Sequence, residues 1–147
     1  RNALAVIDPA TKKVVWAYNG LWEKQHSASF LPNGNILLLD NRGHIENRTR
    51  FSRVLEINPT TLAIKWSYAG SKEHPFYTHS WGRVQRLPNG NTLITETITS
   101  RIFEIDSQGK TVWKYKKSGI LNAIRYNAET LTFLKTPDKS TPKGQLP

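Results

Sequence analysis

The pentapeptide Leu-Pro-Asn-Gly-Asn occurs at residues 31–35 and again at residues 87–91. Each copy follows a His-Ser pair, His26-Ser27 or His79-Ser80, and each leads into an apolar segment. Asn-Gly between apolar segments predicts a β-hairpin with a type I′ turn, which needs positive φ at both central residues. Because the match recurs along one chain, it also indicates a repeat architecture, with two histidines at equivalent points of neighbouring repeats.

A second pattern occurs three times and ends each time in Trp-x-Tyr. The copies end at Trp16-Ala17-Tyr18, Trp66-Ser67-Tyr68 and Trp113-Lys114-Tyr115. In each copy, two segments of alternating apolar and polar residues flank a turn rich in Asp, Asn, Pro or Gly, which predicts a pair of antiparallel strands. In this alternation, Glu56 and Glu104 are expected to face outward.

Joining the two kinds of hairpin gives a four-stranded antiparallel unit. Repetition of such units predicts an all-β fold, a β-propeller of four-stranded blades. The chain supplies about two and a half blades, because its first unit contains only the closing pair of strands. A closed propeller typically takes about 4–8 blades. We therefore interpret the chain as a partial propeller, a fragment; the alternative is a solenoid or sandwich of stacked sheets.

The predicted boundaries follow from these repeats. The blades cover approximately residues 1–20, 26–70 and 79–116. Two closing strands are expected at 120–126 and 131–134, so the partial propeller spans 1–126 with closing strands to 134. Residues 135–147 are rich in Pro, Lys, Ser and Gly, which predicts a flexible basic tail.

The composition excludes several kinds of function. The 147 residues contain no cysteine, which excludes disulfides, thiolate metal sites and cysteine nucleophiles. They contain no methionine either, so we expect the chain to begin after a cleavage or to be a piece of a longer protein. No apolar run is long enough to span a membrane.

The net charge of +10 is concentrated toward the C-terminus, where it suits an acidic partner or a membrane surface, or is simply solvated. A basic tail also suits nucleic acid, but no basic residues interleave with aromatic ones in a recognisable RNA-binding pattern, so no nucleic acid partner is expected.

Four segments in a fixed order resemble the arylsulfotransferase family. They are Gln25-His26-Ser27-Ala28, the first Leu-Pro-Asn-Gly-Asn, Asp40-Asn41-Arg42-Gly43 and the segment 52–57. The resemblance covers roughly residues 3–126. Arylsulfotransferases are β-propeller enzymes that move a sulfuryl group from one phenol to another. The resemblance therefore implies this fold and this activity for the intact parent protein.

The resemblance also implies that His26 is the nucleophile, because the histidine of the Gln-His-(Ser/Thr)-Ala motif becomes transiently sulfated in that family. A neutral imidazole is a competent nucleophile near pH 7, and a covalent intermediate splits one displacement into two easier steps. Negative charge develops on the phenolate and the sulfate oxygens, so fixed cations or N–H donors are needed. The alternative for His26 is a structural histidine that is hydrogen-bonded within the blade.

Four further residues are candidates for substrate binding. His79 occupies the repeat-equivalent position and either lines the central funnel or packs. Asn41 and Arg42 lie in a loop that borders the active site in the resembling family, where they either orient substrate or form a plain turn. Arg125 belongs to an Arg-Tyr element that the family often carries after its last full blade. The implied partners are an aryl sulfate donor and a phenolic acceptor, and the implied location is periplasmic or secreted.

The competing hypothesis is a non-catalytic propeller that serves as a binding or assembly module, with protein partners in a larger complex. Asp8-Pro9 followed by Val14-Val15-Trp16 resembles the blade motif of quinoprotein-like propellers. No metal-ligand spacing occurs among the four histidines and the acidic residues, so no metal site is expected. Glycine-rich phosphate loops are absent too, which argues against a nucleotide sulfate donor, and no cofactor is expected.

Overall fold

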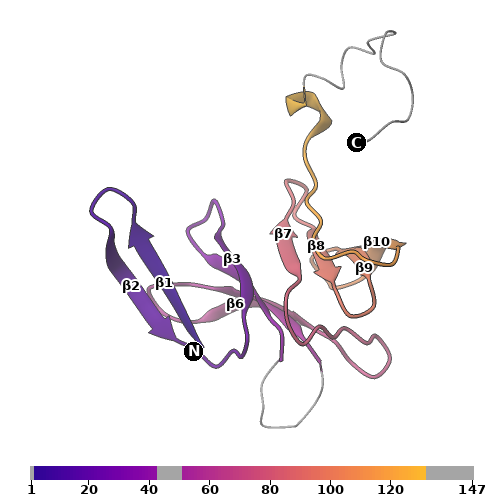
Figure 1. The fold of residues 1–147 in the computed structure, drawn as a ribbon, viewed down its shortest axis with the longest axis horizontal. Helices are drawn as coiled ribbons and strands as arrows, with labels where there is room; N and C mark the ends of the chain where they lie inside the picture. The colour runs from indigo at the N-terminus through magenta and orange to yellow at the C-terminus, as the bar shows by residue number, and fades with distance from the viewer. Residues whose placement is uncertain (1, 43–50, 132–147) are drawn as a thin grey trace.

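The structure is a computed structural model that describes residues 2–42 and 51–131, and its strands form three antiparallel sheets (Figure 1). The first sheet has two strands, β1 (Ala3–Asp8) and β2 (Lys13–Asn19). The second has four strands, β3 (His26–Phe30), β4 (Ile36–Asp40), β5 (Arg53–Ile57) and β6 (Ile64–Ala69). The third has four strands, β7 (Arg83–Arg86), β8 (Thr92–Glu96), β9 (Arg101–Ile105) and β10 (Thr111–Lys116). A short 3₁₀ helix, η2 (Ala128–Thr130), follows.

Within each sheet the strands lie side by side in chain order, so every connection between neighbours is a hairpin. The two four-stranded sheets meet where β7, the first strand of the third sheet, contacts β3 and β4 of the second. Repeated four-stranded antiparallel sheets, preceded by half of another, are the architecture of part of a β-propeller. The prediction of an all-β partial propeller is confirmed.

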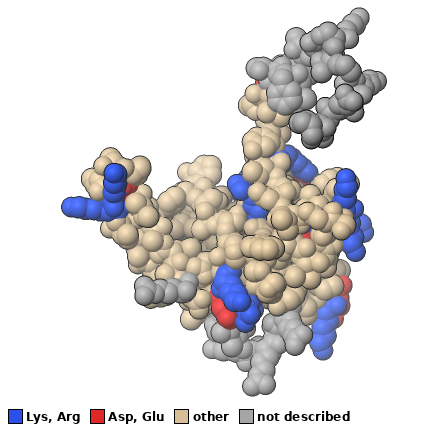
Figure 2. Space-filling model, in the orientation of Figure 1, with Lys and Arg blue, Asp and Glu red and all other residues tan. Residues whose placement is uncertain are grey.

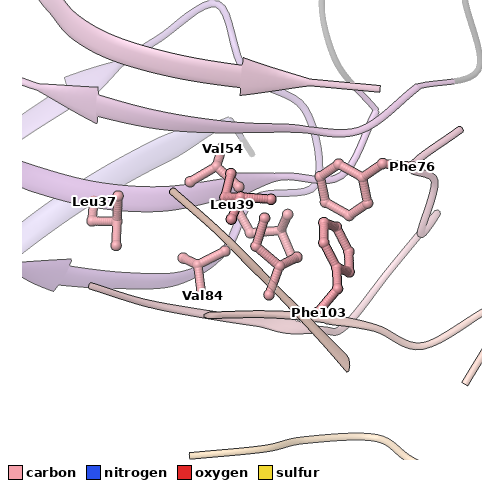
Figure 3. Packing of buried hydrophobic residues seen from close by; sticks show 8 residues of the cluster. Leu37, Leu39, Val54, Phe76, Val84 and Phe103 are labelled. Atoms are coloured by element: carbon pink, nitrogen blue, oxygen red, sulfur yellow. The ribbon is translucent and has the colours of Figure 1, made fainter. Parts of the chain in front are cut away.

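The central strands of the second sheet, β4 and β5, are buried on both faces. Leu37 and Leu39 of β4 belong to a cluster between the two four-stranded sheets (Figure 3). The buried members of this cluster are Leu37, Leu39, Val54, Phe76, Val84, Ile94, Phe103 and Ile105. Ile36 and Leu38, the alternate residues of the same strand, pack instead with residues of the first sheet and of the segment after it. Burying one such side chain contributes about 1.5–3 kcal/mol, so the sheets are held together face to face.

The repeated tryptophans connect neighbouring sheets. Trp16 Nε1 in β2 donates to Pro59 O in the β5–β6 turn at 3.1 Å, and Trp66 Nε1 in β6 donates to Ser107 O in the β9–β10 turn at 3.2 Å. Trp113 in β10 is 43% exposed and makes no equivalent hydrogen bond within the part of the chain that the structure describes. In the first two sheets, the Trp-x-Tyr repeat therefore places one indole against a turn of the sheet that follows.

The Leu-Pro-Asn-Gly-Asn hairpins form, but their turns are not type I′. Gly34 and Gly90 have φ values of 81° and 86°, whereas the asparagine before each glycine does not have positive φ. The N–H of Gly34 donates to Leu31 O at 2.9 Å, so Pro32 and Asn33 form the centre of the turn. Because the proline ring fixes φ near −65°, the positive φ that a type I′ turn needs there is excluded. The type I′ prediction is therefore wrong.

The predicted outward orientation of Glu56 and Glu104 is also wrong, since their exposed fractions are only 9% and 4%. Asn35 Nδ2 donates to Glu56 Oε1 at 2.7 Å, and Arg86 of the third sheet lies 2.9 Å from Oε2. Glu104 repeats this arrangement one sheet further on. Burial alone would raise the pKa of Glu56. The hydrogen bonds from Asn35 and Asn33 and the charge of Arg86 outweigh burial and hold that pKa below its usual value.

We expect Glu56→Gln to destabilise the fold at pH 7 by about 1–3 kcal/mol, because the half-buried Arg86 loses its charged acceptor. A lowered folded-state pKa adds stability that is complete above the ordinary glutamate value of 4.5 and is lost as the pH falls through the folded-state value. In urea denaturation, the difference between wild type and E56Q should therefore shrink as the pH falls below 4.5. Glu129→Gln, at an exposed carboxylate, is the control. A difference that stays constant with pH would contradict the expectation.

The segment after β10 adds no strand at residues 120–126, so that predicted closing strand is wrong. The segment passes beside β7 (Figure 1), where the side chain of Gln85 makes the hydrogen bonds that a neighbouring strand would otherwise make. Gln85 Nε2 donates to Arg125 O, and the Arg125 N–H donates to Gln85 Oε1, both at 2.9 Å. Strand pairing is therefore not needed to satisfy these main-chain groups. Of the other predicted closing strand only Leu131 is described, and the predicted tail lies outside the described residues.

Charged side chains are spread over the surface in separate groups on the face drawn in Figure 2, where Lys and Arg are more evident than Asp and Glu. Arg53 and Arg101 begin equivalent strands and bind the buried carboxylates of Asp40 and Glu96, each at 2.7 Å. These two arginines therefore stabilise the sheets. Among the described residues, no helix is long and apolar enough to cross a membrane.

Candidate functional site

His26 is the first residue of β3 and lies opposite Leu39 of β4. The pairing between these strands shifts between His26 and Ser29, and Ser27 adopts a φ of 57°. Such an irregularity re-aims a side chain that would otherwise follow the regular alternation of the strand. His26 is half-buried, at the start of β3, one of the two strands of the second sheet that contact β7 of the third.

Hydrogen bonds hold the His26 ring in one orientation. His26 Nδ1 lies 2.7 Å from Asn41 Oδ1 and 2.9 Å from Lys24 O. Asn41 Nδ2 donates to Thr78 O at 2.9 Å and to Trp81 O at 2.8 Å, so the Asn41 oxygen must face His26. With two acceptors at Nδ1, the neutral ring carries its proton there, and Nε2 bears the lone pair. The Trp81 N–H donates to Nε2 over a long 3.3 Å.

The residues around Asn41 connect the second and third sheets. Asn41 is fully buried, and its main-chain oxygen accepts a hydrogen bond from Ser52 Oγ at 2.6 Å. Ser52 Oγ in turn accepts from the Thr78 N–H at 2.8 Å. Ser27 Oγ forms a pair of hydrogen bonds with the main chain of Val84 in β7, at 3.2 and 3.3 Å. The His26 site is thus built across the seam between two blades.

Trp81 and Gly82 give the chain a sharp bend just before β7. Both have positive φ, 60° for Trp81 and 89° for Gly82. A Cβ atom at Gly82 would lie 2.7 Å from Thr95 O and 2.9 Å from Leu39 Cδ2, so only glycine fits between the sheets here. Positive φ at a bulky residue such as Trp81 is strained, and such strain is concentrated at functional sites.

A pocket of about 390 Å³ opens beside His26. It is lined by His26, Ser27, Trp81, Gly82, Arg83, Leu121 and Asn122. A second hollow, of about 700 Å³, lies between the outer strands of the second and third sheets and includes His74 and Arg101. Arg101 is occupied there by its ion pair with Glu96, and His74 is exposed in a loop. The pocket beside His26 is thus lined by one imidazole and by one guanidinium group, that of Arg83.

The structure brings together only two of the five predicted site residues, His26 and Asn41. His79 is exposed, and its ring nitrogens lie nearest to Ser80 Oγ, 3.2 Å from Nε2. Arg42 is exposed and lies 3.4 Å from Glu23. Arg125 pairs with Glu104, and its guanidinium lies 5.4 Å from the centre of the Trp113 ring. None of these three residues lines the pocket of His26.

Sequence reasoning missed the other half of the pocket, which Trp81, Arg83, Leu121 and Asn122 supply. The Trp-Gly pair after His79-Ser80 was the available signal, since a glycine between a bulky residue and a strand often marks a close backbone approach. Within the described residues, no group of three His, Asp or Glu side chains is arranged to hold a metal ion.

Comparison with known proteins places these elements in a family. A family model for arylsulfotransferases matches residues 1–118, so the chain belongs to the arylsulfotransferase family. A solved structure of a protein of unknown function from Bacteroides caccae is similar, with 19% identity and a TM-score of 0.50, over 81% of this chain and 56% of that chain. This likeness shows the fold alone. The chain thus spans just over half the length of that protein.

A second solved structure, BamB from Moraxella catarrhalis, has 15% identity and a TM-score of 0.45, over 73% of this chain and 28% of that chain. No curated protein matches the chain.

Proposed function

We propose that the protein containing this chain transfers a sulfuryl group from an aryl sulfate to a phenolic acceptor through a covalent intermediate on His26. Membership of the arylsulfotransferase family supports the reaction class. One observation carries the choice of residue: Asn41 Oδ1 and Lys24 O both face Nδ1 of His26, so the lone pair resides on Nε2 beside the pocket.

In the first half-reaction, His26 Nε2 attacks the sulfur atom of the aryl sulfate. The N–S bond forms while the bond from sulfur to the aryl oxygen breaks, and the phenolate leaves with the electron pair of that bond. The ring becomes a sulfated imidazolium, whose Nδ1–H still donates to Asn41 and Lys24. Hydrogen bonds to that N–H stabilise the positive ring as it forms. The long Trp81 N–H bond to Nε2 must open for attack.

In the second half-reaction, the oxygen of a phenolic acceptor attacks the same sulfur atom. The acceptor loses its proton to solvent or to the departed phenolate, the N–S bond breaks, and its electron pair returns to Nε2. The neutral imidazole with its proton on Nδ1 is restored. This ping-pong scheme needs no nucleotide donor, which suits the proposed periplasmic or secreted location.

The proposal is tested by incubating the intact protein with 4-nitrophenyl sulfate in the absence of an acceptor. We expect a burst of one nitrophenolate per protein and a sulfated peptide that contains His26, identified by mass spectrometry. His26→Ala should abolish both signals. His74→Ala is the matched control, because His74 is exposed in a loop away from the pocket, and it should retain both.

Undiminished turnover in His26→Ala would rule out His26 as the nucleophile. If the intact protein gave neither a burst nor turnover but co-purified with fixed partners, the alternative of a non-catalytic assembly module would replace the enzyme.

A further inference from the structure

Arg83 differs from the other arginines that the structure describes. Each of the others is close to a carboxylate, in the pairs Arg42–Glu23, Arg53–Asp40, Arg86–Glu56, Arg101–Glu96 and Arg125–Glu104. Within residues 2–42 and 51–131, Arg83 has no carboxylate partner, and its Nε is buried without a hydrogen-bond acceptor. Buried polar groups are nearly always satisfied, so an unsatisfied guanidinium nitrogen calls for a ligand or another explanation.

The position of Arg83 supplies that explanation. Arg83 is the first residue of β7, and its main chain is fixed by pairing with Thr95 of β8. Its side chain lines the same pocket as His26 and Trp81. None of the residues that line this pocket is acidic. Among the described residues, no carboxylate neutralises the positive charge that Arg83 brings to this pocket, next to the proposed nucleophile.

We propose that Arg83 binds the oxygens of the sulfate ester in the His26 pocket. This inference rests on the proposed function and adds the residue that recognises the charged group. A guanidinium presents a planar fork of N–H donors that matches two oxygens of a sulfate group, and such charge-assisted pairs are strong and directional.

Trp81 could contact the aryl ring of the same sulfate ester, while Arg83 binds its charged oxygens. Its side chain is 61% exposed and lines the pocket, although its main-chain N–H is tied to His26. An exposed indole offers a flat apolar surface on which an aryl ring can stack. An arginine for the oxyanion and an indole for the ring, in the same pocket as His26, would select an aryl sulfate over inorganic sulfate.

The test measures binding rather than turnover. In the His26→Ala background, which removes the nucleophile, 4-nitrophenyl sulfate is titrated by calorimetry into the full-length protein. Arg83→Gln should weaken binding by about 10-fold or more, and Arg83→Lys should retain part of the affinity, since a lysine keeps the charge but not the fork. Lys13→Gln removes the same charge from an exposed strand and should leave the affinity unchanged.

An uncharged probe separates recognition of charge from damage to the pocket. Binding of 4-nitroanisole should be the same with and without Arg83→Gln. Equal affinity of R83Q and its parent for 4-nitrophenyl sulfate would overturn the inference, even if His26 is sulfated. Arg83-dependent binding without sulfation of His26 would sustain the inference and refute the proposed function.

Should Arg83→Gln fail to fold, the wild-type protein provides the second measurement. Phenylglyoxal modifies accessible guanidinium groups, and peptide mapping reports each arginine separately. Modification of Arg83 should slow at least several-fold in the presence of 4-nitrophenyl sulfate, whereas modification of the exposed, paired Arg42 should not. An unchanged rate at Arg83 would overturn the inference.

Discussion

Replacing Gly82 by alanine is expected to lower the free energy of unfolding by about 2–5 kcal/mol. Part of this loss is conformational, because Gly82 has a φ of 89°, where a Cβ atom is disfavoured. The rest is steric, since the new atom would lie 2.7 Å from Thr95 O and 2.9 Å from Leu39 Cδ2. Thr95 O belongs to the main chain of β8 and cannot rotate away, so the segment that leads into β7 would have to move away from β8 and from Leu39 of the second sheet.

The difference between Gly82→Ala and the control Gly90→Ala gives the steric part of the loss. Gly90 has nearly the same φ, 86°, but an added Cβ would meet nothing within 4 Å. We expect this control to cost only about 1–2 kcal/mol, the conformational part of the loss at Gly82. Urea denaturation followed by tryptophan fluorescence measures both variants. Equal losses at the two glycines would show that Gly82 is not packed against Thr95 and Leu39 as closely as the structure has it.

Asn41→Leu is expected to cost about 2–5 kcal/mol of stability and to reduce sulfuryl transfer about 100-fold. Leucine is similar in size, but it leaves the buried Thr78 O and Trp81 O without the donors that Asn41 supplies. It also removes the Oδ1 acceptor from His26 Nδ1, so the ring loses its fixed orientation and tautomer. Stability and activity should therefore fall together.

Two further variants make the Asn41 prediction specific. Asn41→Asp keeps an oxygen for His26 but directs a second carboxylate oxygen at two carbonyl oxygens, so it should be at least as destabilising as leucine. Asn19→Leu, at an exposed asparagine in β2, should alter neither stability nor transfer by much. Thermal melting and the nitrophenyl sulfate assay provide the two readouts. Full activity in Asn41→Leu would exclude a positioning role for Asn41.

The sheets could be predicted from the sequence because hairpins are local. Turn residues and alternating segments fix which strands pair, and all hairpin partners are close along the chain. The type I′ assignment failed because Asn-Gly was considered without the proline before it. The orientation of Glu56 failed for a different reason. A blade has a neighbour on both faces, so alternation in β5 separates two buried faces rather than core from solvent.

The site could be predicted only in part, because it depends on contacts between sheets. His26 and Asn41 were found through a motif within one blade, and both lie at the seam. Trp81 and Arg83 reach the same pocket from the segment that leads into the next blade, and the Trp81-Gly82 pair indicates a close backbone approach but not which residues it meets. Arg125 was predicted to bind substrate but lies outside the pocket. Its ion pair with Glu104 repeats the pair of Arg86 with Glu56. A repeat can thus place a charged residue for the fold alone.

The hydrogen bonds of His26 have a consequence for how the protein would lose activity. His26 belongs to the second sheet, but the N–H that meets its Nε2 and the carbonyls that hold Asn41 come from the segment leading into the third. A slight parting of the two blades would misalign the imidazole while each blade kept its own strand pairing. As urea is added, turnover should therefore fall before the circular dichroism of the sheets changes. Enzymatic activity would then report a small separation of the two blades earlier than a measurement of their secondary structure does.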